Sequence, residues 1–295
     1  MQTIAHHPSF IFQCGGKSLD FSSRTHVMGV LNVTPDSFSD GGKYFSLEKA
    51  LDGATAMVEE GADIIDIGGE STRPKGPYGE GAADIPAEEE IRRVVPVIRE
   101  MKARSDIPIS IDTYKSAVAE AALSAGAVIV NDISGLRFDS GMARVVGNHG
   151  ATLIAMHIKG TPRTMQQDPT YDDVVAEVKD VLSQSIDQAI DAGIGQIMID
   201  PGIGFGKKLH HNLLILNRLR EFAELGHPVV VGPSRKAFIG VLLDLPVDQR
   251  LEGTAAAVAA CVLNGAHVVR VHDVKEMKRV VLVADAISRT TALQS

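Results

Sequence analysis

The sequence contains no tryptophan, and aromatic residues make up only 4% of its 295 positions. The core must therefore be built from aliphatic side chains. Two cysteines, Cys14 and Cys261, are too few for a disulfide framework, which favours a reducing, cytoplasmic compartment. No stretch approaches ~18 consecutive apolar residues, so a membrane-spanning helix is excluded. The first residues lack the basic and then apolar pattern of a secretory signal, so none is expected.

Basic residues are also in deficit. The chain has 29 Lys and Arg residues against 37 Asp and Glu residues, and its net charge is −8. We therefore expect no nucleic-acid partner, although a local anion site is not excluded. The chain is 44% hydrophobic and 22% charged, which is typical of a globular protein. At ~150 residues per domain the length allows one or two domains, but α/β barrels often take ~250 residues as one.

Eight short apolar runs alternate with longer segments rich in alanine, leucine and glutamate. Each run is continuous, which is typical of strands covered on both faces. The expected strands are 26–32, 64–68, 108–112, 128–132, 152–157, 197–201, 229–234 and 267–272. The expected helices are 46–61, 87–104, 113–125, 140–148, 171–192, 209–225, 250–263 and 273–287, with a short extra helix at 236–243. Several of them end at a glycine, as helix C-caps do.

This alternation predicts an α/β fold, a (β/α)8 TIM barrel that spans residues 1–295 as a single domain. A doubly wound open sheet is the alternative, but such a sheet rarely has eight regular units. Residues 1–24 form an N-terminal extension. Within it, segment 9–22 carries the pair Gly15-Gly16 between two short runs, which predicts a β-hairpin with a tight turn. We expect this hairpin to close the N-terminal mouth of the barrel.

The C-terminal ends of the expected strands are unusually polar. In a barrel of this kind these ends meet at the face where catalysis occurs. A single polar residue there is often a helix cap or a solvated loop residue. So many in one mouth instead indicate a binding site for a polar ligand. They are Asn32, Asp66, Asp112, Asn131, Asp132, His157, Asp200, Ser234, Lys236, Arg270 and His272.

Their residue types suggest what the ligand looks like. Asp112, Asn131 and Asp200 offer acceptors that suit an edge with adjacent N–H donors, such as an aminopyrimidine. Lys236 can donate to a ring carbonyl, and a Schiff-base lysine is the alternative for it. No Ser–His or Cys–His pair stands out as a nucleophilic centre.

An anion site is expected beside these acceptors. Arg270 and His272 lie two positions apart on one strand, just before the last expected helix. We expect both side chains, as cations or nearly so, to bind phosphate or pyrophosphate there. Asn32 supplies an oxygen ligand of the kind that Mg²⁺ takes beside phosphate oxygens and water, and the alternative for it is a loop cap. The glycine- and aspartate-rich loop 33–44 is a candidate lid.

Seven segments, in order, resemble the motifs of the dihydropteroate synthase family. The first two are highly specific, and the similarity covers about residues 25–288. The segments are G-V-L-N-V-T-P-D-S-F-S-D-G-G (29–42), D-I-G-G-E-S-T-R-P (66–74), I-D-T (111–113), V-N-D-I-S-G (130–135), D-P-G-I-G-F-G-K (200–207), G-P-S-R-K-A-F-I-G (232–240) and R-V-H-D-V (270–274).

The resemblance implies a reaction in folate biosynthesis. Such an enzyme joins 6-hydroxymethyl-7,8-dihydropterin diphosphate to 4-aminobenzoate with Mg²⁺, and it yields 7,8-dihydropteroate and pyrophosphate. Sulfonamides, which mimic aminobenzoate, are then expected inhibitors. The resemblance also implies a homodimer, for which segments 250–263 and 273–287 are the candidate contacts.

The resemblance further implies roles for individual residues. Position 32 matches the metal ligand, and four positions match the pterin site. Two match the diphosphate site, and two match the loop near both substrates. Two more, with the first turn of the helix at Lys236-Ala237, match the aminobenzoate pocket. The metal ligand is Asn32, and the pterin-site residues are Asp112, Asn131, Asp200 and Lys236. The diphosphate-site residues are Arg270 and His272, the loop residues are Thr72 and Arg73, and the aminobenzoate-pocket residues are Phe205 and Ser234. Of these, Lys236, Arg270, His272 and Asp112 are the expected catalytic residues.

Two departures from the family pattern stand out. The second loop, 75–86, is longer than expected, and Ala237 stands where many members carry serine. Two rival functions stay open. One is a pterin-binding methyltransferase that uses methyltetrahydrofolate, which would not need the 33–44 loop or the Arg270–His272 pair. The other is a non-catalytic paralogue that binds pterin without condensing it.

Overall fold

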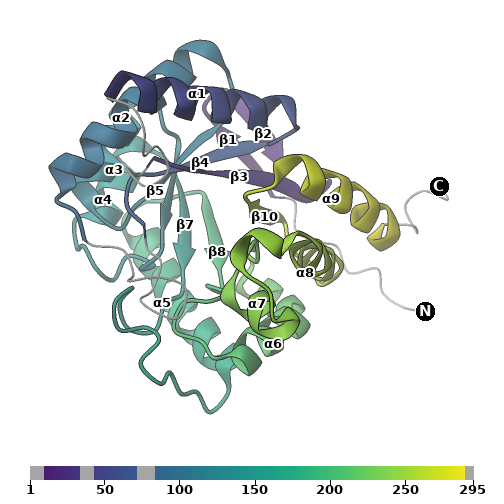
Figure 1. Cartoon of the computed structure of the whole chain (residues 1–295). Helices are drawn as coiled ribbons and strands as arrows, with labels where there is room; N and C mark the ends of the chain where they lie inside the picture. Colours follow the sequence, from purple (N-terminus) through teal and green to yellow (C-terminus); the bar gives the residue numbers. More distant parts are fainter. Residues whose placement is uncertain (1–9, 34–42, 72–83, 290–295) are drawn as a thin grey trace.

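The computed structural model describes residues 10–33, 43–71 and 84–289. Eight parallel strands form its centre, and neighbours pair in the order β8-β7-β6-β5-β4-β3-β10-β9 (Figure 1). A bridge between Ile199 and Val229 joins the two outer strands of this order, so the sheet closes into the predicted barrel. The strands are β3 (His26–Asn32), β4 (Ile64–Gly68), β5 (Ile109–Asp112), β6 (Ile129–Asp132), β7 (Thr152–Met156), β8 (Ile197–Asp200), β9 (Val230–Val231) and β10 (Val268–Val271).

Helices surround the barrel, and the short α7 packs against α6 and α8 outside it (Figure 1). No helix in the described ranges is long and apolar enough to cross a membrane. The helices are α1 (Lys43–Glu59), α2 (Ala87–Arg104), α3 (Ser116–Ala125), α4 (Met142–His149), α5 (Val174–Asp191), α6 (Leu209–Asn217), α7 (Ala237–Leu243), α8 (Leu251–Leu263) and α9 (Val274–Ser288).

The expected helix 209–225 is divided in two. The α-helix ends at Asn217, and Leu219–Leu225 forms a 3-10 helix. Arg218 lies between them and bonds to Asp173 at 3.1 Å and to Glu221 at 2.7 Å. Residues three apart are eclipsed in a 3-10 turn, which suits the contact between Arg218 and Glu221. A tertiary ion pair of this kind is invisible to apolar periodicity.

The predicted N-terminal hairpin is present and lies where it was expected. Its strands β1 (Ile11–Cys14) and β2 (Lys17–Asp20) pair antiparallel. Gly15 and Gly16, with φ of +62° and +89°, form the turn, as a primed two-residue turn requires. The buried side chains of the hairpin form one cluster with residues near the start of the barrel strands, and so close that mouth. The cluster contains Phe12, Cys14, Leu19, Phe21, Met28, Ile64, Ile129, Ile154, Met198, Val230 and Val268.

Strand register then determines what fills the opposite mouth. Gly68 pairs with Asp112, Asp112 pairs with Asn131, and Met156 pairs with Asp200. Because side chains alternate along a strand, the residues two positions beyond the apolar layer also point inward. The polar ends of neighbouring strands therefore face one another above an aliphatic core.

Candidate active site

Four side chains at the barrel mouth form one connected polar network. The Arg270 guanidinium lies between two carboxylates, with Nε 2.6 Å from Asp66 Oδ2 and Nη2 2.7 Å from Asp112 Oδ2. Asn131 Nδ2 donates to the same Asp66 oxygen at 3.0 Å. The network joins β10, β4, β5 and β6. The structure thus brings together three of the predicted site residues and adds Asp66, for which the sequence suggested no role beyond its place at a strand end.

Asp200 and Lys236 lie on the other side of the mouth. Asp200 is buried at the end of β8, and its Oδ1 accepts a bond from the Gly202 N–H at 2.7 Å. The Lys236 ammonium lies over the Phe205 ring, 4.2 Å from its centroid. Gly202 has φ of +71°, and a Cβ there would lie 1.9 Å from the His157 carbonyl oxygen, so only glycine fits.

The turn that carries Phe205 is held from beneath by Lys207, which the sequence did not single out. The Lys207 ammonium is buried and contacts His157 Nδ1 at 2.8 Å and the Phe205 carbonyl oxygen at 3.0 Å. Burial lowers the pKa of Lys207 well below its usual value. A lysine after a glycine-rich turn is usually predicted to be exposed to solvent. Nothing in the sequence therefore indicated that Lys207 would be buried.

His272 corrects one expectation. Burial, with the nearby Arg270 and Arg235 charges, lowers the pKa of His272 to about 4, so the ring is neutral at pH 7. Its Nδ1 lies 3.1 Å from Ser234 Oγ, and that same oxygen accepts the His272 backbone N–H at 3.2 Å. The expected pair of cations is therefore one cation, Arg270, and one neutral imidazole that can donate a hydrogen bond.

Asn32 lies exposed at the end of β3, close to Asp112. A Cβ placed on Gly68 would lie 3.9 Å from Asn32 Oδ1 and 3.8 Å from Asp112 Oδ2. An amide oxygen and a carboxylate oxygen thus flank the space that a side chain at position 68 would fill. The predicted site residues Thr72 and Arg73, and most of the expected lid loop, lie outside the described residues.

Burial changes the protonation of the central groups. It raises the pKa of Asp112 to about 7, although Arg270 opposes the rise. It raises the pKa of Asp200 to about 6 and, together with Arg270, lowers that of Lys236 to about 8. In each case, removal from water destabilises the charged form of the side chain. A ligand that donates N–H groups to the carboxylates and accepts from the ammonium would restore the charged forms.

An Asp200→Asn variant is expected to be more stable than the unmodified chain at pH 7, by about 1–3 kcal/mol. Because the pKa of Asp200 rises from 3.8 to about 6 on folding, ionisation favours the unfolded chain, and stability falls as pH rises through this window. The carboxamide keeps an oxygen for the Gly202 N–H. Urea unfolding at pH 7 and pH 4 measures the difference, which should nearly vanish at the lower pH. Asp187→Asn, on the exposed side of α5, is the control.

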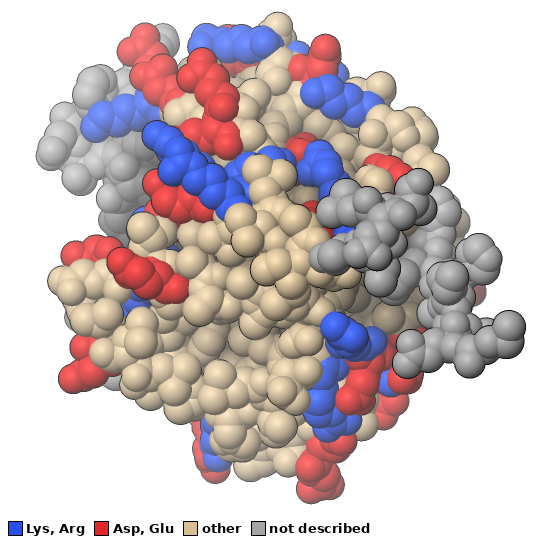
Figure 2. Space-filling view, turned by 90° about the vertical axis from the view of Figure 1, so that its right-hand side faces the viewer, with Lys and Arg blue, Asp and Glu red and all other residues tan. Residues whose placement is uncertain are grey.

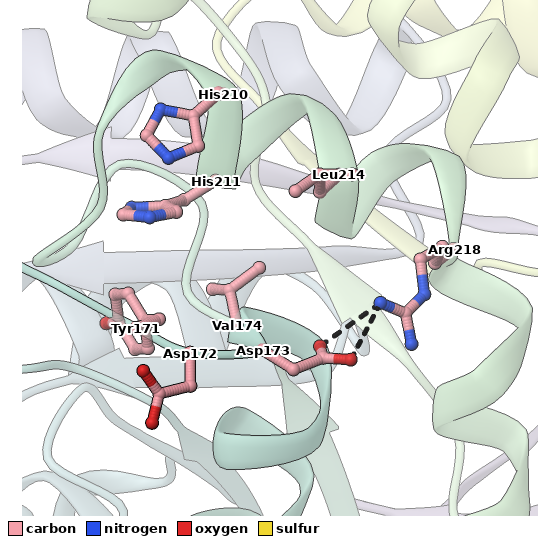
Figure 3. Close-up of a pocket in the computed structure, with 8 residues that line it drawn as sticks. All are labelled: Tyr171, Asp172, Asp173, Val174, His210, His211, Leu214 and Arg218. Carbon is pink, nitrogen blue, oxygen red and sulfur yellow. Dashed lines mark hydrogen bonds and ion pairs between the residues drawn. The ribbon is translucent and has the colours of Figure 1, made fainter.

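A pocket of about 200 Å³ lies elsewhere, between the first turns of α5 and α6 (Figure 3). None of its lining residues belongs to the barrel-mouth set. Asp173 there is paired with Arg218, and the His210 and His211 rings lie 3.9 Å apart. Tyr171 uses its hydroxyl to hold the Gly206 carbonyl oxygen at 2.7 Å. Tyr171 therefore supports the glycine-rich turn from its outer side. The pocket is separate from the candidate active site at the barrel mouth.

Comparison with known sequences gives consistent matches. A family model described as "Pterin binding enzyme" matches residues 28–272. The chain is 47% identical over 278 residues to a dihydropteroate synthase of Synechocystis sp., covering 93% of this chain and 94% of that protein. A dihydropteroate synthase of Bacillus subtilis is 46% identical, covering 92% of this chain and 91% of its own length.

Solved structures agree. A Yersinia pestis dihydropteroate synthase in a sulfonamide drug complex has a TM-score of 0.87 and 41% identity, covering 94% of this chain and 99% of that chain. A Xanthomonas albilineans dihydropteroate synthase with 4-aminobenzoic acid has a TM-score of 0.86 and 42% identity, covering 98% of this chain and 99% of that chain. These likenesses extend over nearly the whole chain. The chain belongs to the dihydropteroate synthase family of pterin-binding transferases.

Proposed function

We propose that the barrel mouth condenses 6-hydroxymethyl-7,8-dihydropterin diphosphate with 4-aminobenzoate, giving 7,8-dihydropteroate and pyrophosphate. The observation that carries the proposal is that two buried acceptors, Asn131 and Asp200, and the part-buried Asp112 share the mouth with the part-buried ammonium of Lys236. Asp112 and Asn131 meet through Arg270 and Asp66 on one side, and Asp200 lies with Lys236 on the other. An aminopyrimidine edge beside a ring carbonyl has the matching donors and acceptor.

Each group then has a defined task. Asp112, Asn131 and Asp200 accept the N–H bonds of the pterin, and Lys236 donates to its carbonyl. The C–O bond between the exocyclic methylene and the diphosphate breaks, and the pterin ring shares the positive charge that develops. The arylamine nitrogen then forms the new C–N bond and releases a proton to solvent. Arg270 and the neutral His272 donate hydrogen bonds to the departing pyrophosphate.

We propose Asn32 as the magnesium ligand. In the described ranges, no group of three or more His, Cys, Asp or Glu side chains is placed to hold a metal. A magnesium ion would therefore depend on the Asn32 oxygen, water and the diphosphate oxygens, which is the mixed ligand set that it prefers. When bound, the ion neutralises charge on the diphosphate. The position of Asn32 Oδ1 at the end of β3, beside Gly68, supports this assignment.

We propose Phe205 and Ser234 as the wall of the aminobenzoate pocket. Phe205 presents its ring beside the Lys236 ammonium, and Ser234 lies next to His272. The arylamine would thus lie between the pterin and the β8 and β9 loops. Thr72 and Arg73 would complete the site from the second loop.

The test of this function is pyrophosphate release with dihydropterin diphosphate, Mg²⁺ and 4-aminobenzoate, each omitted in turn. Release that requires all three supports the synthase. Saturable pterin binding without release would favour the non-catalytic paralogue instead. Binding of methyltetrahydrofolate in its place would favour the methyltransferase.

We propose a homodimer through the face that carries α8 and α9. Figure 2 shows a broad area without charged side chains on this face. Leu282 and Val283 on α9 are 60% and 62% exposed, and Leu251 on α8 is 37% exposed. Exposed apolar side chains on a face with few charges are typical of an interface. Light scattering should give the mass of two chains, and Leu282→Glu with Val283→Glu should give one. A monomeric unmodified chain would contradict the proposal.

Two further proposals concern the chain as a whole. The hairpin shares one buried cluster with the barrel interior, which supports a single domain over residues 1–295. Cys14 and Cys261 are both buried free thiols, which supports a reducing, cytoplasmic location.

A further inference from the structure

The Asp66 carboxylate lies at the centre of the mouth, although no substrate role was assigned to it. It is fully buried on β4, at 0% exposure. One oxygen, Oδ2, accepts from Arg270 Nε at 2.6 Å and from Asn131 Nδ2 at 3.0 Å. These donors come from β10 and β6, which flank β4 on opposite sides in the barrel order. A single oxygen therefore joins the residue proposed for the diphosphate to one proposed for the pterin.

Arg270 divides its guanidinium between two unequal partners. Nε faces Asp66, and Nη2 faces Asp112 at 2.7 Å. The side chain of Asp112 is 16% exposed, whereas that of Asp66 is not exposed at all. A ligand that enters the mouth can thus reach Asp112 but not Asp66.

In the proposed reaction, each substrate group needs one partner of the contact between Arg270 and Asp112. The pterin edge needs the Asp112 oxygens, and the diphosphate needs the Arg270 donors. Separating a buried ion pair is costly when either charge is left without compensation. Because Arg270 also holds Asp66, it keeps a buried counter-ion while Asp112 changes partner.

We propose that Asp66 is a positioning residue, the permanent counter-ion of Arg270 that lets Asp112 exchange the guanidinium for the pterin. The inference rests on the proposed function. In it, Asp66 touches neither substrate. It fixes Arg270 and Asn131 relative to each other while the Asp112 contact breaks.

A substitution at Asp66 can remove its negative charge while keeping the size of the side chain. Asp66 Oδ1 has no hydrogen-bond partner in the described part of the chain, so both bonds run through Oδ2. Asp66→Asn keeps one carbonyl oxygen for both donors, removes the charge, and places an amide NH2 group where Oδ1 makes no hydrogen bond. Ser110 is the register partner of Asp66 on β5, and its buried hydroxyl also has no partner among the described residues. Ser110→Ala is therefore a matched control that leaves the network intact.

The experiment is calorimetric binding of 6-hydroxymethylpterin, which carries no diphosphate. In Asp66→Asn, Asp112 becomes the remaining counter-ion of Arg270 and is released less readily, so affinity should fall about tenfold or more. Ser110→Ala should stay within about twofold of the unmodified chain. The double variant Asp66→Asn/Arg270→Met frees Asp112 and should recover to within about threefold. At saturating pterin diphosphate, KM for 4-aminobenzoate should not change in Asp66→Asn.

The results distinguish failure of this inference from failure of the proposed function. If Asp66→Asn binds the pterin as the unmodified chain does, or if the double variant fails to recover, the inference is wrong and the proposed function stands. If the unmodified chain binds no pterin, the proposed function fails and the inference falls with it. If Asp66→Asn does not fold, the double variant, which lacks both the Asp66 and the Arg270 charge, carries the test. Its affinity should match the unmodified chain, and a tenfold loss would overturn the inference.

Discussion

An Asp200→Ala variant should bind dihydropterin diphosphate about 100- to 1,000-fold more weakly than the unmodified chain. Asp200 is buried at the end of β8, so the lost carboxylate would leave pterin N–H donors without a partner and without access to water. The loss also releases the Gly202 N–H, which Asp200 holds at 2.7 Å. Isothermal titration calorimetry measures the affinity directly.

The matched control for this variant is Asp187→Ala, which removes a carboxylate from the exposed side of α5 and should not change the affinity. Circular dichroism should show that both variants keep the barrel. An affinity for the pterin within threefold of normal in Asp200→Ala would show that this carboxylate does not contact the ligand. Loss in both variants would instead indicate a general effect on folding.

A Lys236→Met variant should lower kcat/KM for dihydropterin diphosphate about 100-fold, because a charge-assisted hydrogen bond from an ammonium to a carbonyl is worth about 2–3 kcal/mol. Methionine keeps the length of the stem, which packs near Gly204 and the Phe205 ring. The defect should lie in the affinity for the pterin, with little change in KM for 4-aminobenzoate.

The same variant tests the protonation of Lys236. Since its pKa is lowered to about 8, the unmodified chain should lose pterin affinity as pH rises above 8, where the ammonium loses its proton. In Lys236→Met that decline should disappear. Lys275→Met on the exposed side of α9 is the control and should keep the decline. A decline of equal size in Lys236→Met would assign it to another group.

The positions of the strands followed from the sequence because continuous apolar runs mark buried parallel strands without reference to their partners. All eight runs became barrel strands, and the Gly15-Gly16 turn gave the hairpin. The mouth residues followed for a related reason. Strand ends meet at one face, so polar residues there share a site whatever their sequence separation.

The sequence did not indicate which side chains would form hydrogen bonds and ion pairs with one another inside that site. Nothing in its spacing indicated that Asp66 would take Arg270, or that Lys207 would turn inward toward His157. The neutral state of His272 depends on burial and on neighbouring guanidinium groups, which arise only after folding. These are properties of three-dimensional contacts, and a one-dimensional pattern does not determine them.

The barrel closes at a narrow seam, and this has a consequence for its motions. β9 contains two residues, and one bridge, from Val229 just before it to Ile199 on β8, closes the barrel there. A short ladder has few cooperative bonds, so amide exchange should reveal this seam as the first part of the cylinder to open. Asp200 lies just above it on β8, and Lys236 follows β9. A pterin bound to both side chains would link the two sides of this seam and stabilise it. Slower amide hydrogen exchange along β8 and β9 would then report that the site is occupied.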